Sequence, residues 1–232
     1  VGEDDPEFRA SPEDMAERMG EFGEYIGWLF ESRQRDPGDD IASMLANSAP
    51  DGKAPDFNQF LADMILVTVG GNETVRNSVS HGVCAFAENP DQWADFCRTE
   101  DARASGAQEI VRYASPVLHM RRTAMEDTLI GETPVRAGDK VVLWYVAGNR
   151  DGTVFEAPNR FDIRREKNRH LGFGTGQHVC VGQRVAELQL RTLFGEMAKR
   201  YSGFGIVGKP DRLRSNFING LKSLNVVPKG RT

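Results

Sequence analysis

The chain has 232 residues, of which 27% are charged, and its formal net charge at pH 7 is −5. This length suits one large domain or two small ones and is enough to bury a core. The acidic balance provides no basic field for nucleic acid or an anionic membrane, and no run of about 18 apolar residues predicts a membrane span.

The three cysteines, Cys84, Cys97 and Cys180, are widely spaced and form no C-x-x-C pair. This pattern indicates neither a disulfide framework nor a zinc site. A reducing cytoplasm is therefore the expected compartment. We recognise no signal peptide, and the start at Val1 instead of an initiator Met suggests that the natural beginning lies elsewhere.

Two helices are expected near the N-terminus. Ser11 followed by Pro, Glu and Asp is typical of a helix start, and apolar residues then recur at helical spacing, which predicts a helix over 11–35. A turn over 36–40 separates it from a short helix that begins at 41–45. A second break is expected at 49–53.

A long helix is expected over 57–88, capped by Asp56 and ended by Asn89-Pro90. Because this segment is mostly apolar, it is predicted to be buried on several sides. Its interior contains Gly70-Gly71, and each glycine costs about 1 kcal/mol relative to Ala. The close approach of a small or flat group to the helix would explain why glycine occupies both positions.

The remaining pattern predicts a mainly helical protein with small β-sheets. Apolar clusters around Gly131 and Gly138 are typical of a strand hairpin, and residues 150–176 read as a long irregular segment. A strand-like pattern occupies 214–228. Further helices are expected over 91–98, 107–114 and 183–200.

The run Phe173-Gly-Thr-Gly-Gln-His-Val-Cys180-Val-Gly182 is the most informative stretch. The N–H groups at the start of the helix that follows can stabilise a thiolate, and Gly174 and Gly176 permit turn conformations. The run resembles the haem-binding loop of the cytochrome P-450 family, whose iron is held by a cysteine thiolate. The resemblance implies haem b ligated by Cys180. A buried structural cysteine beside a hydrogen-bonded His is the alternative.

The run Gly70-Gly-Asn-Glu-Thr74 resembles the oxygen-binding signature of the same family. A hydroxyl can relay a proton and an adjacent acid can supply one, which are the catalytic roles expected of Thr74 and Glu73. The glycines Gly70 and Gly71 would leave room for dioxygen. Alone, the pair would read as ordinary helix residues with Thr74 bonded back to a carbonyl.

A third motif, Glu109-x-x-Arg112, matches the buried acid–base pair of the family, and Arg160 is the expected third member. Arg suits a buried pair because it keeps its charge. These three residues are expected to be structural. An exposed ion pair is the usual alternative for this spacing.

The resemblance also assigns residues around the haem. His178 and Arg122 match positions that bind the propionates, and Phe173 matches the aromatic residue near the thiolate. Gly182 leaves space where the flat cofactor would lie on the backbone, and Gly174 is also counted among the cofactor-binding residues. For Arg122 the alternative is exposure to solvent, since it lies beside Arg121.

The resemblance runs from about Asp39 to the C-terminus. A complete member of the family is roughly twice this length, so the chain is expected to have a truncated cytochrome P-450 fold that lacks the N-terminal half. We expect residues 1–232 to form a single domain, the C-terminal part of the catalytic domain. Because one wall of the haem pocket would be missing, the chain alone should keep little activity.

Several short segments of the sequence resemble those of soluble bacterial hydroxylases. Some of these enzymes act on alkanes and fatty acids, and others on terpene alcohols, methyl-branched lipids and steroid side chains. Asn219-Gly-Leu-Lys222 leans toward the second group. All the residues expected to face the substrate are apolar, so they offer no partner to a polar group. Core packing is the alternative for each of them. They are Leu66, Val69, Leu118, Met120, Phe217 and Ile218.

The expected function is a haem-thiolate monooxygenase that inserts one oxygen atom of O2 into an unactivated C–H bond. Electrons would come from NAD(P)H through a ferredoxin, which Arg184 and Arg191 could help to dock. Alternatives are a peroxide-dependent peroxygenase, a non-catalytic haem-binding remnant, and a hydrolase that uses Cys180 with His178. The acid–alcohol pair argues against the peroxygenase.

Overall fold

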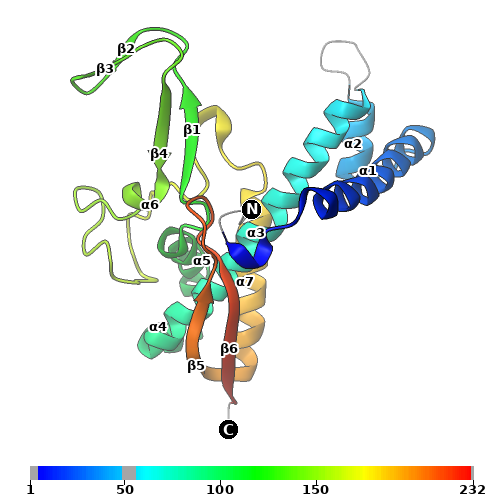
Figure 1. The fold of residues 1–232 in the computed structure, drawn as a ribbon. Helices are drawn as coiled ribbons and strands as arrows, with labels where there is room; N and C mark the ends of the chain where they lie inside the picture. Colours follow the sequence, from blue (N-terminus) through cyan, green and yellow to red (C-terminus); the bar gives the residue numbers. More distant parts are fainter. Residues whose placement is uncertain (1–4, 49–55, 231–232) are drawn as a thin grey trace. The chain divides into compact units, whose positions relative to one another are not determined.

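A computed structural model describes residues 5–48 and 56–230 (Figure 1). Within it the chain divides into two compact units, one formed by 6–72 and the other by 73 onward together with Asp5. Because one long helix, α3 (Phe57–Glu88), runs through the boundary, the expected single domain stays a prediction. No helix of the described residues is long and apolar enough to cross a membrane.

The first unit contains the short 3-10 helix η1 (Pro6–Phe8), α1 (Pro12–Arg35), α2 (Ile41–Asn47) and the first part of α3. The cap residues explain where its helices start. Ser11 Oγ accepts the Asp14 N–H at 3.0 Å, and Asp40 and Asp56 accept in the same way from the third residue after them. The predicted helices are therefore confirmed. The predicted break at 49–53 lies outside the described residues.

The core of this unit is small. Ile26, Leu29, Ala46 and Phe60 are buried, and the rings of Phe30 and Phe60 lie 5.0 Å apart. These side chains come from one face of α1, one face of α2 and the start of α3. The helical spacing read from the sequence therefore marks the residues that pack.

The middle of α3 differs from its prediction. Residues 66–72 are all exposed, and Leu66 keeps 71% of its surface. Later in the same helix, Asn77 and Phe86 are almost fully buried. The expectation of burial on several sides was wrong for 66–72. An apolar composition allows a helix to be buried but does not determine which segments pack against it.

The second unit holds α4 (Pro90–Phe96), α5 (Glu100–Ala114), α6 (Tyr145–Gly148), η2 (Gly176–His178) and α7 (Gln183–Arg200). Helix α5 starts at Glu100 and not at 107 as predicted, because Thr99 caps it by accepting the Ala102 N–H at 3.2 Å. The predicted bounds of α7 are confirmed. The predicted irregular segment is confirmed as well, with no helix or strand over 151–175.

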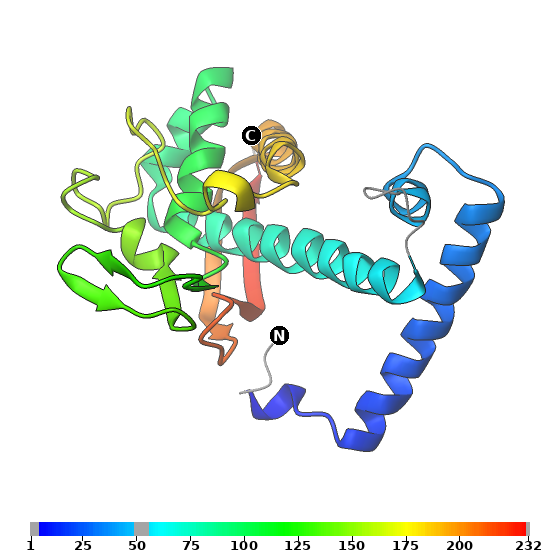
Figure 2. The same cartoon turned by 90° about the horizontal axis from the view of Figure 1, so that it is seen from above.

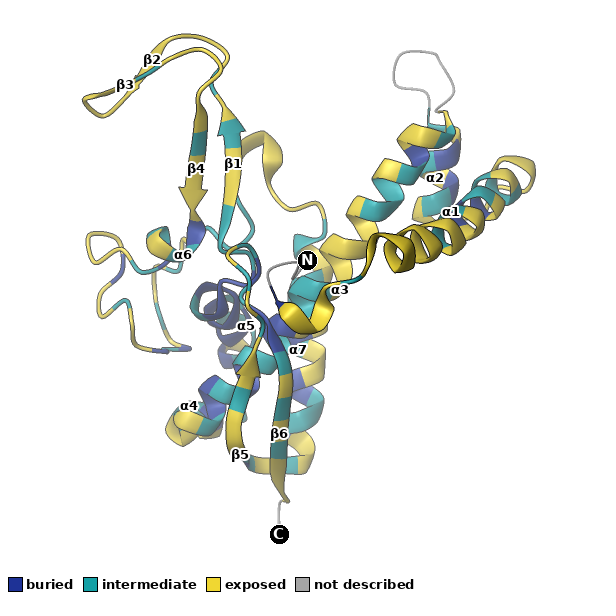
Figure 3. Ribbon diagram, viewed as in Figure 1, coloured by how far each residue is buried: buried dark blue, intermediate teal, exposed yellow. Residues whose placement is uncertain are grey.

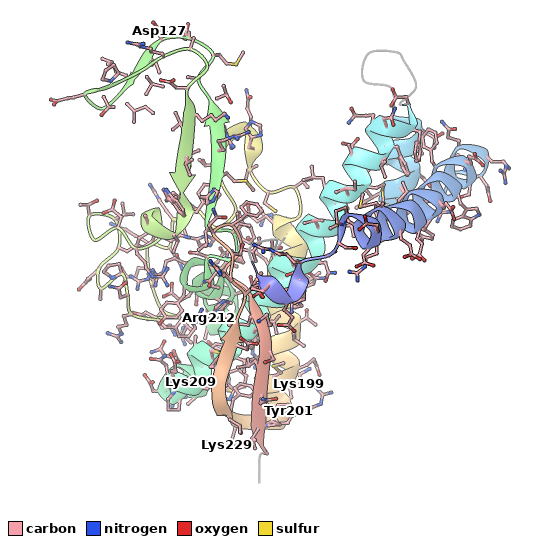
Figure 4. The ribbon with its side chains drawn as sticks, viewed as in Figure 1. Asp127, Lys199, Tyr201, Lys209, Arg212 and Lys229 are labelled. Carbon is pink, nitrogen blue, oxygen red and sulfur yellow. The ribbon has the colours of Figure 1, made fainter. Side chains whose placement is uncertain are left out.

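Three antiparallel strand pairs complete the unit. β1 (His119–Thr123) pairs with β4 (Lys140–Trp144), β2 (Thr128–Ile130) with β3 (Thr133–Val135), and β5 (Tyr201–Arg212) with β6 (Leu221–Gly230). Gly131, at φ +60°, lies in the turn of the predicted hairpin. Figure 4 shows Tyr201 and Lys229 at one end of the β5–β6 pair and Arg212 toward the other. Strands β1 and β5 were not predicted.

The core of the second unit is aromatic. The ring of Phe86 lies 5.0–5.5 Å from the rings of Trp93, Phe96 and Phe194. Figure 2 shows the helices that meet there, and Figure 3 shows the buried residues on them. A Cβ at Gly82 would lie 2.7 Å from the Phe194 ring, so α3 needs glycine to approach α7 this closely.

A buried ion pair on α5 joins this core to the irregular segment. Glu109 and Arg112 are both 0% exposed, and two hydrogen bonds of 2.7 Å link the carboxylate to the guanidinium. Arg112 also donates to the carbonyl oxygens of Asn149 (2.7 Å) and Pro158 (2.8 Å). The alternative of an exposed surface pair is thereby excluded.

The third member of this network is not the one expected. Arg160 contributes only its carbonyl oxygen, which accepts from Arg112 at 2.9 Å, while its own side chain is exposed. The guanidinium that reaches Glu109 belongs to Arg165, at 3.3 Å, and its side chain is 8% exposed. Spacing along an irregular segment does not determine which of two nearby arginines points inward, so the prediction of Arg160 was wrong.

We expect Glu109→Gln to lower the free energy of unfolding by about 3–5 kcal/mol, because it leaves the Arg112 guanidinium buried without a counter-charge. Urea unfolding followed by circular dichroism measures this loss. Glu196→Gln is the matched control, since Glu196 pairs with Lys199 and Arg200 at the surface and should change stability little. Equal losses in the two variants would contradict the structural role of the buried pair.

Candidate functional site

The loop 173–182, called the cysteine loop below, is closed by its own backbone. The Cys180 N–H donates to the Phe173 carbonyl at 2.8 Å, and the Val179 N–H donates to the Gly176 carbonyl at 3.1 Å. Gly174 and Gly176 have φ of +69° and +68°, a region that disfavours side chains. The loop therefore depends on the glycines that its motif contains.

The thiol of Cys180 is exposed and lies just before α7, whose N-cap is Gly182. The Gln183 N–H donates to the Cys180 carbonyl at 3.3 Å. The start of α7 presents backbone N–H groups that have no acceptor within the helix. A Cβ at Gly182 would lie 3.9 Å from the thiol sulfur, so this residue lies against Cys180.

The other loop residues differ in exposure. Phe173 is half-buried, packs against the aromatic core, and has its ring 5.5 Å from that of His170. His178 is exposed at the end of η2.

The acid–alcohol pair lies on α3, and both Glu73 and Thr74 are half-buried. The Glu73 carboxylate accepts from Arg76 at 2.9 Å and from Asn77 at 3.2 Å. Ser78 Oγ donates to the Thr74 carbonyl at 2.8 Å. One turn of helix thus gathers an acid, an alcohol and the groups that orient the acid.

The glycines before this pair have open space around them. A Cβ at Gly70 or Gly71 would meet no atom within 4 Å apart from the helix's own backbone and chain neighbours. Within the described chain, therefore, no packing contact requires glycine at these two positions. Room for a small ligand remains the proposed reason for them.

Arg122 is half-buried on β1, opposite Val141 of β4, whereas its neighbour Arg121 is exposed. One Nη of Arg122 donates to the Arg121 carbonyl at 3.0 Å. The alternative of full exposure is therefore excluded for Arg122. A role toward a propionate stays a prediction.

The six predicted substrate residues fall into three groups by exposure. Leu66, Val69 and Met120 are exposed, at 71%, 42% and 37%. Leu118 and Phe217 are half-buried. Ile218 is only 3% exposed, and its backbone bridges to Val117, so core packing explains it better than contact with a substrate.

No motif in the sequence predicted a role for His170, which contacts the start of the cysteine loop through Phe173. Its Nδ1 accepts the Gly172 N–H at 3.1 Å, and its Nε2 lies 2.8 Å from Gln108 Oε1. These two bonds need a neutral ring with the proton on Nε2. Burial, and then the charge of Arg112, lower the pKa of His170 from 6.5 to about 4.

Comparisons with known proteins agree with this geometry. The sequence model of the family described as "Cytochrome P450" matches residues 107–217. Linalool 8-monooxygenase of Pseudomonas putida is 53% identical over 227 residues, which are 98% of this chain and 56% of that protein. The steroid C26-monooxygenase of Rhodococcus jostii is 40% identical over 97% of this chain and 47% of its own length.

Among solved structures, a Mycobacterium marinum cytochrome P-450 in complex with pseudoionone superimposes with a TM-score of 0.89. It is 35% identical to this chain, with 95% of this chain and 53% of that one covered. The chain belongs to the cytochrome P-450 family and corresponds to the C-terminal part of its members. It spans about half the length of the relatives it matches.

The cofactor of this family is haem ligated by a thiolate. The residues of the cysteine loop fit such a group. The Cys180 thiol is exposed at a helix N-terminus, and the flanking Val179 and Val181 are 48% and 100% exposed. Exposed apolar side chains on both sides of a thiol are suited to contact with a large apolar ligand.

We expect the stability of the chain to fall as the pH drops from about 6.5 to about 4, in part through His170. In this window the unfolded chain binds a proton at His170 and the folded chain does not, so protonation favours unfolding. Above pH 6.5 the ring is neutral in both states and this effect vanishes.

The free energy of unfolding of wild type and His170→Gln, measured by urea titration between pH 4 and pH 7, tests this expectation. The wild-type curve should fall more steeply toward acid. The lowered pKa of His81, which burial causes, affects both proteins equally and cancels in the difference. Parallel curves would show that the His170 ring is not held neutral.

Proposed function

We propose that this chain carries the C-terminal half of the active site of a haem-thiolate monooxygenase. The reaction would insert one oxygen atom of O2 into an unactivated C–H bond of an apolar substrate. The observation that carries the proposal is the exposed Cys180 thiol, held by the backbone bond to Phe173 at the start of α7. The acid–alcohol pair on α3 of the same chain supports it.

In this proposal Cys180 is the protein ligand of the haem iron. The haem, when bound, supplies the oxygen activation and the one-electron chemistry that side chains cannot. The protein residues would hold and orient it. Arg122 and His178 would donate to the propionates, and Phe173 would pack beside the thiolate and shield it from water.

Glu73 and Thr74 would deliver protons on the other face of the haem. The Thr74 hydroxyl can donate a hydrogen bond to a bound oxidant and pass on a proton received from the Glu73 carboxyl. The side chain of Glu73 is 29% exposed, so it can exchange protons with solvent. The exposed Gly70-Gly71 face would leave room for O2.

The substrate is proposed to be a terpenoid or another molecule with a branched apolar chain. Linalool 8-monooxygenase and a steroid C26-monooxygenase are named among the relatives, and both names denote oxidation of largely hydrocarbon molecules. Leu118, Met120 and Phe217 of the second unit would offer apolar surface to such a chain, and Leu66 and Val69 of the first unit are proposed as further contacts.

Electrons are proposed to come from NAD(P)H through a ferredoxin that docks on the thiolate side. The side chain of Arg184 on α7 is 92% exposed and makes only a distant ion pair with Glu187, at 3.9 Å. Arg191 pairs with Glu100 of α5. Arg184 is therefore better placed than Arg191 to meet an acidic partner.

The carbon-monoxide difference spectrum of the reduced, haem-reconstituted chain tests the thiolate ligand. We expect a strongly red-shifted Soret band, because a thiolate donates electron density to the iron. Cys180→Ser should abolish this shift. Cys84→Ala is the control, because Cys84 is half-buried and its burial raises the pKa of its thiol. A shifted band in Cys180→Ser would overturn the assignment.

Thr74→Ala should lower the product formed per NAD(P)H oxidised by at least about tenfold, since a positioned proton donor contributes this much or more. Consumption of NAD(P)H should persist, with peroxide released in place of product. The assay is product analysis with a terpene alcohol in the haem-loaded full-length enzyme. Thr68→Ala, an exposed position on the same helix, is the control. Unchanged yield in Thr74→Ala would favour a peroxide-driven enzyme.

A further inference from the structure

Asn77 is a fully buried amide that no motif predicted. Its side-chain nitrogen donates to two oxygens of Glu73, the carbonyl at 2.9 Å and the carboxylate at 3.2 Å. Its side-chain oxygen accepts the N–H of Leu221 at 3.0 Å. One amide group therefore bonds to the acid of the proposed proton relay and to a residue 144 positions away.

Arg76 makes a parallel connection between the same two residues. It donates to the Glu73 carboxylate at 2.9 Å and to the Leu221 carbonyl at 3.3 Å. Both main-chain polar groups of Leu221 are thus bonded to side chains that also bond to Glu73. The side chain of Arg76 is 47% exposed, so solvent screens its ion pair, and the buried amide of Asn77 is the more directional link.

Leu221 is the first residue of β6 and follows the β5–β6 loop, residues 213–220. This loop carries Phe217 and Ile218, two of the predicted substrate residues. The adjacent Asn219 is fixed as well, since its side chain donates to the Ala114 carbonyl at 2.6 Å and its carbonyl lies 2.9 Å from His81 Nε2. Because hydrogen bonds hold both Asn219 and Leu221, a displacement of the loop would be transmitted to Leu221.

We propose that Asn77 is a positioning residue that couples the Glu73 carboxylate to the β5–β6 loop. A ligand that contacts Phe217 would then change the orientation of Glu73, and a change at the Glu73 side chain would change the order of the loop. The two effects are reciprocal because they express one coupling free energy. This inference rests on the proposed role of Glu73 as a proton donor.

The coupling follows from the limited hydrogen-bonding capacity of a buried amide. Asn77 cannot rotate toward the loop or toward Glu73 without leaving a buried N–H or oxygen unsatisfied. Its two ends therefore move together. A purely structural Asn77 would hold Leu221 in the same way whatever side chain occupied position 73.

Hydrogen–deuterium exchange of the 232-residue chain separates these possibilities without haem. We expect the Leu221 amide to exchange about tenfold faster in Asn77→Ala, because its acceptor is removed. We expect faster exchange in Glu73→Ala as well, because the Asn77 side-chain nitrogen then loses the carboxylate and keeps only the carbonyl of residue 73 as an acceptor. Glu73→Gln should restore part of the protection, since its amide oxygen can still accept from Asn77.

Glu88→Ala, an exposed acid at the end of the same helix, is the control and should leave Leu221 unchanged. Wild-type protection of Leu221 in Glu73→Ala would overturn the proposal, because Asn77 would then serve the loop alone. If Asn77→Ala does not fold, Asn77→Asp keeps the acceptor for Leu221 but removes the donor to Glu73. It should then shift the carbon-13 resonance of the Glu73 carboxylate, and an unchanged resonance would equally overturn the proposal.

The outcome of the hydrogen–deuterium exchange experiment is independent of the test of the proposed function. Loss of the red-shifted band would reject Cys180 as the ligand and leave the exchange data intact. Conversely, an unchanged Leu221 amide in Glu73→Ala would reject the coupling even where Cys180 binds the haem. The two failures therefore cannot be confused.

Discussion

The buried pair of Glu109 and Arg112 is the interaction on which the second unit depends. Two fully buried charges are tolerated only when they face each other and when their other polar atoms are bonded. Arg112 meets this condition with three main-chain carbonyls, and Glu109 with the Asp162 N–H (2.8 Å) and the Asn168 side chain (3.0 Å). A long segment without helix or strand thereby gains a fixed path.

From this pair a series of hydrogen bonds leads to the cysteine loop and to the backbone N–H of Cys180. The carbonyl of Asn149 accepts from Arg112, and its side chain accepts the Leu171 N–H at 2.6 Å. Leu171 then accepts from Gly174, and Phe173 accepts from Cys180. The acid–base motif and the cysteine loop are separate in sequence but belong to one hydrogen-bond network. Loss of the Glu109 carboxylate should therefore alter the position of Cys180.

The opposite side of the proposed site is organised by a different principle. Glu73 is held by half-exposed and buried polar side chains of its own helix, and these also fix the start of β6. Bonds of this kind are weak enough to rearrange on ligand binding, whereas the Glu109 pair is not. A rigid support for the metal ligand and an adjustable one for the proton donor suit the proposed reaction.

The sequence by itself determined the family, the helix starts of the first unit and the glycine-dependent loop around Cys180, because caps, φ-restricted turns and motifs act through neighbours in the chain. Only the tertiary structure decided that Arg165 and not Arg160 reaches Glu109, that residues 66–72 are exposed, and that Asn77 bonds to Leu221. Each of these depends on which distant atom fills the space beside a side chain. Local sequence carries no information about that choice, since it is made by the packing of segments far apart in the chain.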